Sequence, residues 1–163
     1  MDAKREGEPV KNRTTVERKS DRELVVTRMF NAPARLVFEA WTKPELFQRW
    51  WVPKSMGMTL QSFEADIRTG GTYRLTFAPD VAFFGKYLEV TPHSRLVWTN
   101  EESDAGAVTT VTFEEKAGKT LLTLHELYPS KEALEQNAGA EEGLPEQFEQ
   151  LDELLGTLGA RVA

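Results

Sequence analysis

A run of strand patterns that ends in one amphipathic stripe limits most strongly what this chain can fold into. The strand patterns lie at residues 58–68, 72–77, 85–90, 95–100, 108–115 and 120–128. No helical pattern separates them, so each strand is expected to pair with its neighbour along the chain. The sequence therefore predicts an antiparallel meander.

A long helix is predicted from about Pro145 to Gly159. Its apolar stripe follows alternating steps of four and three residues, at Leu144, Phe148, Leu151, Leu155 and Leu158. Its predicted solvent face holds Glu146, Gln147, Glu149, Gln150, Asp152 and Glu153. A helix that follows an antiparallel sheet has to bury its stripe on that sheet. We therefore predict an α+β fold in which a curved sheet wraps around the C-terminal helix.

The first part of the chain adds a strand and two short helices. From Glu23 the side chains are expected to alternate between two faces, with Leu24, Val26 and Arg28 opposite Val25, Thr27 and Met29, which indicates a strand. Two prolines then suit the first position of a helix, because that position needs no backbone donor. They predict one helix from Pro33 to Trp41 and a second from Pro44 to Trp50.

Several short motifs occur in a fixed order along the chain. They are R-x-F-x-A-P at residues 28–33, V-x-x-A-W at 37–41, W-W at 50–51 and D-x-R-x-G-G at 66–71. From about residue 22 to the end, their order and spacing resemble the heat-shock protein 90 ATPase activator homologue family of the START-like (SRPBCC) superfamily. The resemblance implies the helix-grip fold, a hydrophobic cavity between sheet and helix, a link to stress response and a chaperone as partner. In the family's helix pattern G-W-x-x-x-L-x-x-L, the chain has leucine in place of tryptophan.

Length, charge and composition exclude several classes of protein. A chain of 163 residues fits one domain, which we predict over residues 22–163. The net charge of −6 argues against a nucleic-acid binder, which needs clustered Lys and Arg. No apolar run is long enough for a membrane span, so no membrane partner is expected. Residues 1–21 are predicted to form a disordered, charged tail that lacks the apolar core of a signal peptide. The chain also has no cysteine, and together with the missing signal-peptide core this predicts a cytoplasmic location.

Aromatic residues are numerous enough on the predicted strands and helices to line a ligand cavity. Each would otherwise be ordinary core, because one large aromatic side chain buries about 150–250 Å². Tyr73, Tyr87 and Trp98 combine an apolar ring with a hydrogen-bonding group, so they are the best candidates to orient a ligand. The predicted ligand contacts are Trp41, Trp50, Phe63, Tyr73, Phe77, Tyr87, Trp98, Phe113, His125, Leu144 and Phe148.

Catalytic and metal chemistry has little support in the sequence. The two histidines are His93, in a predicted turn, and His125, in a predicted strand, where it would act as a general base only if it faced the cavity. We find no nucleophile–base pair and no cluster of zinc ligands, and predict no catalytic residue, metal or cofactor. Asp66 and Arg68 share one strand face, where an exposed ion pair is favoured over a polar clamp inside the cavity.

The sequence leaves three kinds of function open. The first is a binding protein for an apolar or aromatic small molecule held between sheet and helix. The second, which the resemblance implies, is a protein-interaction module of the chaperone-activator type; a homodimer is also open. A weaker third is a cyclase- or hydrolase-like enzyme. A sizeable cavity would favour the first, a filled core with an exposed apolar patch the second, and a buried carboxyl group with a perturbed pKa the third.

Overall fold

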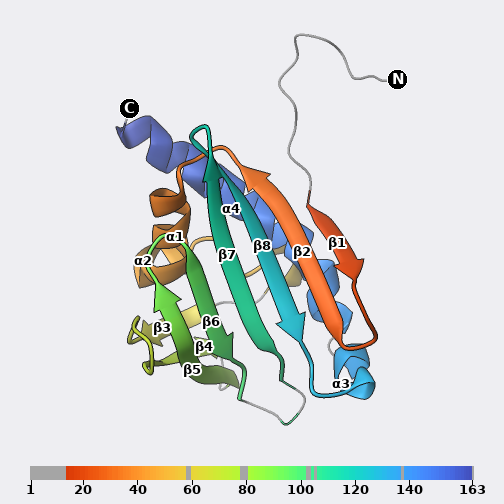
Figure 1. The fold of residues 1–163 in the computed structure, drawn as a ribbon. Helices are drawn as coiled ribbons and strands as arrows, with labels where there is room; N and C mark the ends of the chain where they lie inside the picture. Colours follow the sequence, from red (N-terminus) through yellow and green to blue (C-terminus); the bar gives the residue numbers. More distant parts are fainter. Residues whose placement is uncertain are drawn as a thin grey trace, which may run out of the picture.

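The computed structural model describes residues 14–57, 60–77, 81–101, 104, 106–136 and 138–162. Residues 1–13 of the predicted tail lie outside the described residues. One antiparallel sheet runs through the molecule, and the long C-terminal helix lies across one of its faces (Figure 1). The predicted α+β architecture, a curved sheet around a C-terminal helix, is confirmed.

The sheet has the strand order β1-β2-β8-β7-β6-β5-β4-β3, and all neighbouring strands are antiparallel. After β2 the chain crosses to the far edge and returns strand by strand, which confirms the predicted meander. The strands are β1 (Thr15–Arg18), β2 (Glu23–Phe30), β3 (Leu60–Ala65), β4 (Thr72–Phe77), β5 (Val81–Thr91), β6 (Arg95–Thr99), β7 (Val108–Lys116) and β8 (Lys119–Leu127).

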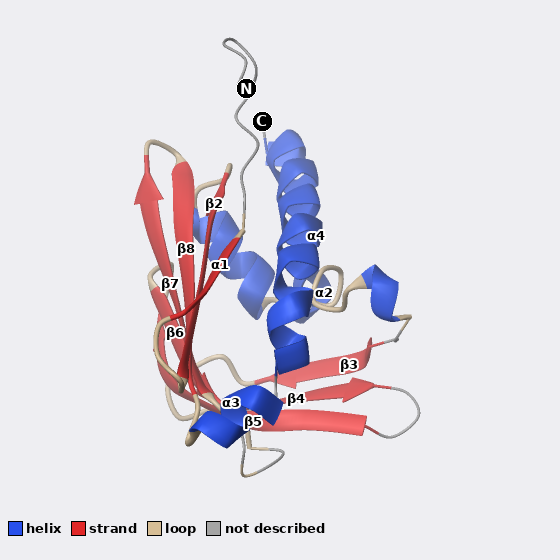
Figure 2. Ribbon diagram, turned by 90° about the vertical axis from the view of Figure 1, so that its right-hand side faces the viewer, coloured by secondary structure: helices blue, strands red, loops and turns tan. Residues whose placement is uncertain are grey.

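The helices cover one face of this sheet (Figure 2). Two short helices follow β2, as predicted, but the second ends before Trp50 because residues 48–50 form turns. The C-terminal helix begins before Pro145, which therefore lies inside it rather than in its first turn. The helical segments are α1 (Ala34–Thr42), α2 (Pro44–Phe47), the 3-10 helix η1 (Lys54–Met56), α3 (Lys131–Gln136) and α4 (Ala138–Val162).

Strand β5 bends the sheet so that its far half turns beneath α4. Its first half pairs with β4 and its second half pairs with β6, with a register shift between Tyr87 and Glu89. Such a bulge bends a strand and increases its twist. Gly85 lies just before it, where a Cβ atom would be only 2.1 Å from the Thr99 carbonyl oxygen. As Figure 2 shows, β3, β4 and the first half of β5 consequently cross beneath the helix.

The apolar stripe of α4 faces the unbent half of the sheet, as predicted. Phe148 and Leu151 are fully buried, and Leu144 is nearly so. The Phe148 ring packs edge-on against Phe30 of β2, with ring centroids 5.7 Å apart. We call this packed region, built around Phe30, Phe113, Phe148 and Leu151, the closed core.

The polar face of α4 is only partly the solvent face that the sequence predicts: Glu149 and Glu153 are exposed, but Gln147 is buried. Gln147 donates a hydrogen bond to the Trp51 carbonyl oxygen. One turn further on, Gln150 donates to the Val52 carbonyl oxygen at 2.9 Å. The loop over residues 50–55 has no strand partner, so its backbone groups take side-chain partners instead. These glutamines therefore fasten the loop to α4.

A buried arginine accounts for two more residues of that face. Arg28 is only 3% exposed and points from β2 toward α4. Its Nη2 lies 3.2 Å from Asp152 Oδ2, and its Nη1 lies 3.5 Å from Glu149 Oε2. A buried guanidinium needs charged partners. Asp152 therefore turns toward the sheet, whereas Glu149 reaches Arg28 from the surface and remains 56% exposed.

Both ends of the sheet bear on the sequence predictions. Thr15–Arg18 pairs with β2 as β1, and Val16 packs against the core, so the predicted disordered tail is wrong for these four residues. At the turn between β3 and β4, Arg68 donates to Asp66 at 2.7 Å, and both side chains are exposed. The expected surface ion pair is confirmed.

Candidate ligand-binding cavity

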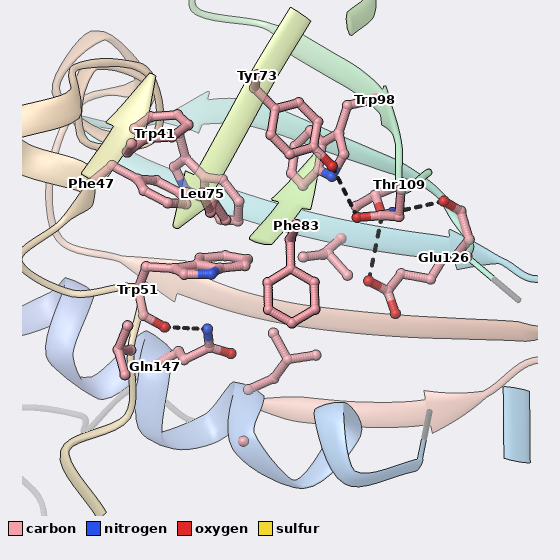
Figure 3. A pocket seen from close by; sticks show the side chains of 18 of the residues that line it. Trp41, Phe47, Trp51, Tyr73, Leu75, Phe83, Trp98, Thr109, Glu126 and Gln147 are labelled. Carbon is pink, nitrogen blue, oxygen red and sulfur yellow. Dashed lines mark hydrogen bonds between the residues drawn. The ribbon is translucent and has the colours of Figure 1, made fainter. Parts of the chain in front are cut away.

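A cavity of about 430 Å³ lies between the bent half of the sheet and the first turns of α4. Strands β3 to β8 form one side of it, and α1, α2, the following loop and α4 form the other. Figure 3 shows that its two ends differ. We call one the apolar end (Trp41, Phe47, Trp51) and the other the polar end (Tyr73, Asn100, Thr109, Glu126, Tyr128).

The rings of the apolar end support one another. Phe47 is stacked on Trp51 with centroids 4.8 Å apart, and Phe63 lies 4.4 Å from Phe47. Trp41 meets Trp51 edge-on at 6.0 Å and lies 5.8 Å from Trp98. Such offset and edge-on contacts are the favourable ones between aromatic rings. The indole N–H of Trp41 is buried and has no hydrogen-bond partner among the described residues.

Most of the predicted ligand contacts line this cavity. They come from α1, from strands β3 to β6 and from α4, and they surround one space although they are distant in the sequence. Their contact with a ligand stays a prediction. The set comprises Trp41, Phe63, Tyr73, Phe77, Tyr87, Trp98 and Leu144.

Trp50, Phe113 and Phe148 do not line the cavity, contrary to the sequence prediction. Trp50 is fully buried and donates its indole N–H to the Ala40 carbonyl oxygen at 2.9 Å. Phe113 packs edge-on against Phe38 with centroids 5.5 Å apart. These rings lie where the helices pack directly on the unbent half of the sheet, so they fill the space that a ligand would need.

His125 lies on the opposite face of β8 from the cavity. Leu124 and Glu126 both line the cavity, and the residue between two inward-facing strand residues faces outward. The His125 Nε2 is 2.9 Å from Glu23 Oε2 of β2, and both side chains are partly exposed. The strand alternation thus removes His125 from the predicted ligand contacts and from the role of a general base in the cavity.

A chain of hydrogen bonds begins at Tyr73 and crosses the polar end. The Tyr73 hydroxyl donates to the Thr99 carbonyl oxygen at 2.6 Å and lies 3.2 Å from Asn100 Oδ1. Asn100 Nδ2 donates to the Ala107 carbonyl oxygen at 2.7 Å and to the Thr109 hydroxyl at 3.0 Å. Three strand ends are joined in this way beside the cavity.

The chain reaches a carboxyl group at Glu126. The Tyr128 hydroxyl donates to Glu126 Oε1 at 2.8 Å, and the Thr109 hydroxyl lies 3.5 Å from Oε2. Burial raises the pKa of Glu126 above its ordinary value, although these hydroxyls and the charge of His125 act in the opposite direction. Burial also raises the pKa of the Tyr87 hydroxyl in the cavity wall. A low-dielectric site disfavours the ionised forms of both groups.

Sequence reasoning missed most of the polar end. The available signal was a carboxyl group at an inward position: Glu126 continues the face of β8 that Leu122 and Leu124 bury. A charged residue on such a face requires partners or a changed pKa. The missed aromatic and polar lining residues include Phe47, Trp51, Phe83, Asn100, Thr109, Glu126, Tyr128 and Gln147.

The mouth of the cavity lies beside Met56 of η1 and Phe83 of β5. Both line the cavity and are also exposed, at 58% and 36% of their surface. The loop that carries Met56 is held to α4 through Gln147, whose bond to Trp51 is drawn in Figure 3. Solvent or a ligand can therefore approach between this loop and the β4–β5 hairpin.

Metal-binding and membrane-spanning features are absent from the residues that the structure describes. In this part of the chain, no three His, Cys, Asp or Glu residues lie close enough together to hold a metal ion. None of the described helices combines the length and hydropathy that a membrane span requires.

A curved antiparallel sheet that grips a C-terminal helix defines the helix-grip fold of START-like proteins. Within that class, the chain belongs to one family: the model described as "Activator of Hsp90 ATPase homolog 1-like protein" matches residues 31–156. The resemblance seen in the sequence motifs is thereby confirmed.

Solved bacterial structures share the fold. A protein of Nitrosomonas europaea superimposes with a TM-score of 0.76 at 23% identity, over 84% of this chain and 96% of that chain. A protein of Rhodobacter sphaeroides superimposes with a TM-score of 0.79 at 20% identity, over 89% of this chain and 99% of that chain. A protein of Staphylococcus epidermidis superimposes with a TM-score of 0.68 at 29% identity, over 88% of this chain and 94% of that chain. No curated protein matches this chain. These similarities establish the fold and leave the ligand open.

Proposed function

We propose that this protein binds a flat, largely apolar small molecule in the cavity and does not turn it over. The observation that carries the proposal is the cavity of about 430 Å³, with aromatic walls and a few convergent polar groups at one end. Small-molecule sites typically measure roughly 300–1,000 Å³ and have this composition. The Trp41 N–H, which has no hydrogen-bond partner among the described residues, and the Glu126 carboxyl are available to orient a ligand.

The size of the cavity argues against a simple packing defect. An empty apolar cavity costs about 24 cal/mol per Å³, so a dry cavity of this size would cost on the order of 10 kcal/mol. That is comparable with the total stability of a typical domain, about 5–15 kcal/mol. The cavity therefore holds water or a ligand, and its aromatic surface is a poor partner for water.

The two alternative functions, a protein-interaction module and an enzyme, are each supported by one observation. Phe84 and Leu88 expose apolar side chains on β5, which suits a protein-interaction module, but the interior is hollow rather than filled. Glu126, with its raised pKa, suits an acid catalyst. Among the described residues, its hydrogen-bond donors are the hydroxyls of Thr109 and Tyr128, which make no nucleophile–base pair. The chaperone partner, the homodimer and the cytoplasmic location remain predictions.

Binding can be tested with N-phenyl-1-naphthylamine, a neutral dye whose emission rises in apolar surroundings. We expect saturable binding by the native protein and a higher melting temperature in its presence, because a ligand of the folded state stabilises it by mass action. The Leu144→Trp variant places in the cavity wall the residue that the family pattern has there. It should weaken dye binding about tenfold or more, since its added volume occupies the cavity.

The matched control is Leu88→Trp, which adds the same ring on the exposed outer surface of β5. It should bind the dye like the native protein. Equal loss of binding in both variants, or no saturable binding by the native protein to the dye or to a broader panel of aromatic compounds, would refute the cavity as a binding site.

A further inference from the structure

The hydrogen bonds of the polar end have a defined direction. The Ala107 carbonyl oxygen can only accept, so the Asn100 atom 2.7 Å from it must be the amide nitrogen. The same nitrogen then donates to the Thr109 hydroxyl oxygen at 3.0 Å. Because that oxygen accepts from Asn100, the one hydroxyl proton of Thr109 is left to point toward Glu126.

Glu126 is thus the end point of the chain, and it has acceptor capacity to spare. A carboxylate has about four acceptor positions on its two oxygens. Tyr128 occupies one on Oε1 with a bond of 2.8 Å. Thr109 approaches Oε2 at 3.5 Å, which is long for a hydroxyl donor. Oε2 is therefore the oxygen most open to a donor from a ligand, and it faces the cavity (Figure 3).

Glu126 also has no counter-ion among the described residues that line the cavity. Among the described residues that line the cavity, none is Lys, Arg or His, and Glu126 is the one acid. A carboxylate in an apolar cavity without a counter-ion is unfavourable, whereas one paired with a cation is stabilised. An anionic ligand such as a fatty acid would meet a carboxyl group and no cation. A ligand with a positively charged donor would supply both the missing charge and the missing hydrogen bond.

Building on the proposed function of the cavity, we propose that its ligand is an arylalkylamine, an aromatic ring system that carries its amine on an aliphatic carbon. Its ring system lies against the apolar end at Trp41, Phe47 and Trp51, and its protonated nitrogen donates to Glu126 Oε2. The two ends lie on opposite sides of one continuous space, as Figure 3 shows, so one molecule can meet both. Glu126 is then the residue that selects cationic over neutral and anionic ligands.

At a pH where Glu126 is protonated in the free protein, binding of an amine should also release a proton. Burial favours the neutral form of Glu126 in the free protein, and a bound ammonium group favours the carboxylate. Among the described residues, the other titratable groups at the cavity are the hydroxyls of Tyr73 from β4, Tyr87 from β5 and Tyr128 after β8. His125 and Glu23 pair with each other on the outer face. A proton released from the cavity when the amine binds therefore comes from Glu126.

The test uses four naphthalenes with the same ring system and different heads: 2-methylnaphthalene, 2-naphthylmethanol, 2-naphthylmethylamine and 2-naphthoate. Calorimetric titration in two buffers of different ionisation enthalpy gives both affinity and proton release. We expect the amine to bind at least tenfold more tightly than the methyl compound, and 2-naphthoate to bind most weakly. At a pH below the raised pKa of Glu126, proton release should accompany the amine alone.

The Glu126→Gln variant keeps the size of the side chain and removes its charge. It should lose both the preference for the amine over 2-methylnaphthalene and the proton release. Glu114→Gln, an exposed position on β7, is the matched control and should retain both. The ligand series in the native protein decides the matter even where Glu126→Gln does not fold.

The outcomes separate this inference from the function on which it rests. Binding of 2-methylnaphthalene with no added affinity for the amine, or tighter binding of 2-naphthoate, would overturn the amine preference and leave the apolar cavity site standing. An amine preference that persists in Glu126→Gln would overturn the role of Glu126. Failure of all four compounds and of the neutral dye to bind would overturn the proposed function itself.

Discussion

The closed core around Phe148 and the cavity beside Trp51 lie under the same helix and against the same sheet. Both are rich in aromatic rings, and Trp41 contributes to both, since it contacts Phe148 at 6.3 Å and also lines the cavity. In the closed core the rings interlock and are almost completely buried. Around the cavity they form walls. Similar residues therefore make a solid interior on one side and a hollow one on the other.

The sheet explains the difference. Strands β2, β7 and β8 face α1 and α4 directly, so their inward side chains meet those of the helices. Beyond the bulge in β5, the sheet turns beneath α4. A bulge changes the local twist without changing composition. Whether an aromatic residue is core or cavity wall is thus decided by where the sheet bends.

The sharpest test of this contrast removes the same ring from each side. Phe148→Ala should lower the free energy of unfolding by roughly 3–5 kcal/mol, because it opens a new void in a packed interior. Phe83→Ala, at the mouth of the cavity, removes a partly exposed ring that packs against Phe77 with centroids 5.6 Å apart. We expect it to cost about 1 kcal/mol. Urea unfolding of both variants measures the difference.

The comparison of the two variants can also contradict the proposed contrast between closed core and cavity. If Phe83→Ala destabilises as much as Phe148→Ala, the rim of the cavity is as firmly packed as the closed core and the contrast fails. Dye binding adds a second comparison. Phe83→Ala should alter the affinity for N-phenyl-1-naphthylamine, whereas folded Phe148→Ala should bind it nearly as the native protein does.

The next test concerns the ion pairs that hold α4 on the closed side. Asp152→Ala leaves the buried Arg28 with its weaker partner, Glu149 at 3.5 Å, so the loss should be about 1–3 kcal/mol. Glu149→Ala removes a side chain that is 56% exposed, and it should cost less than about 1 kcal/mol. Thermal melts at low and at high salt distinguish the two. A larger loss for Glu149→Ala would reverse the assigned order.

Patterns of period two and 3.6 were sufficient to predict the antiparallel meander, the C-terminal helix and its buried stripe. They could not locate the bulge, because nothing in the apolar pattern around Tyr87 and Glu89 marks a register shift. They also assigned Gln147 and Asp152 to solvent, since the partners of these residues, Trp51 and Arg28, are distant in the sequence. Propensity describes one element at a time, whereas these contacts join two.

The candidate site was predictable in its apolar part and missed in its polar part. A cavity wall of aromatic residues follows from composition and from the fold that the motifs imply. The choice between His125 and Glu126 depends on one step along β8, because neighbouring strand residues face opposite sides of the sheet. His125 was predicted as a ligand contact because its imidazole is chemically versatile. The residue of β8 that faces the cavity is instead Glu126.

The smallest expected effect is the pH dependence of stability that Glu126 causes. It tests whether the polar end of the cavity is an enclosed site. Burial raises the pKa of Glu126 in the folded protein above the value of 4.5 that an unperturbed glutamate has. The folded state therefore binds this proton more tightly than the unfolded state, and stability falls as the pH rises from about 4.5 through the raised pKa. A pKa that is higher by one pH unit in the folded state corresponds to a loss of about 1.4 kcal/mol.

Glu126→Gln cannot ionise, so it should escape this loss. Near pH 4 its melting temperature should differ little from that of the native protein, because both side chains are neutral. Toward pH 8 the variant should become the more stable of the two. Glu23 and Glu146 have lowered pKa values and make both proteins less stable in acid, but they cancel in the difference. A difference that stays constant between pH 4 and 8 would show that Glu126 ionises as freely as a surface carboxyl. The polar end would then be an extension of the solvent rather than part of an enclosed site.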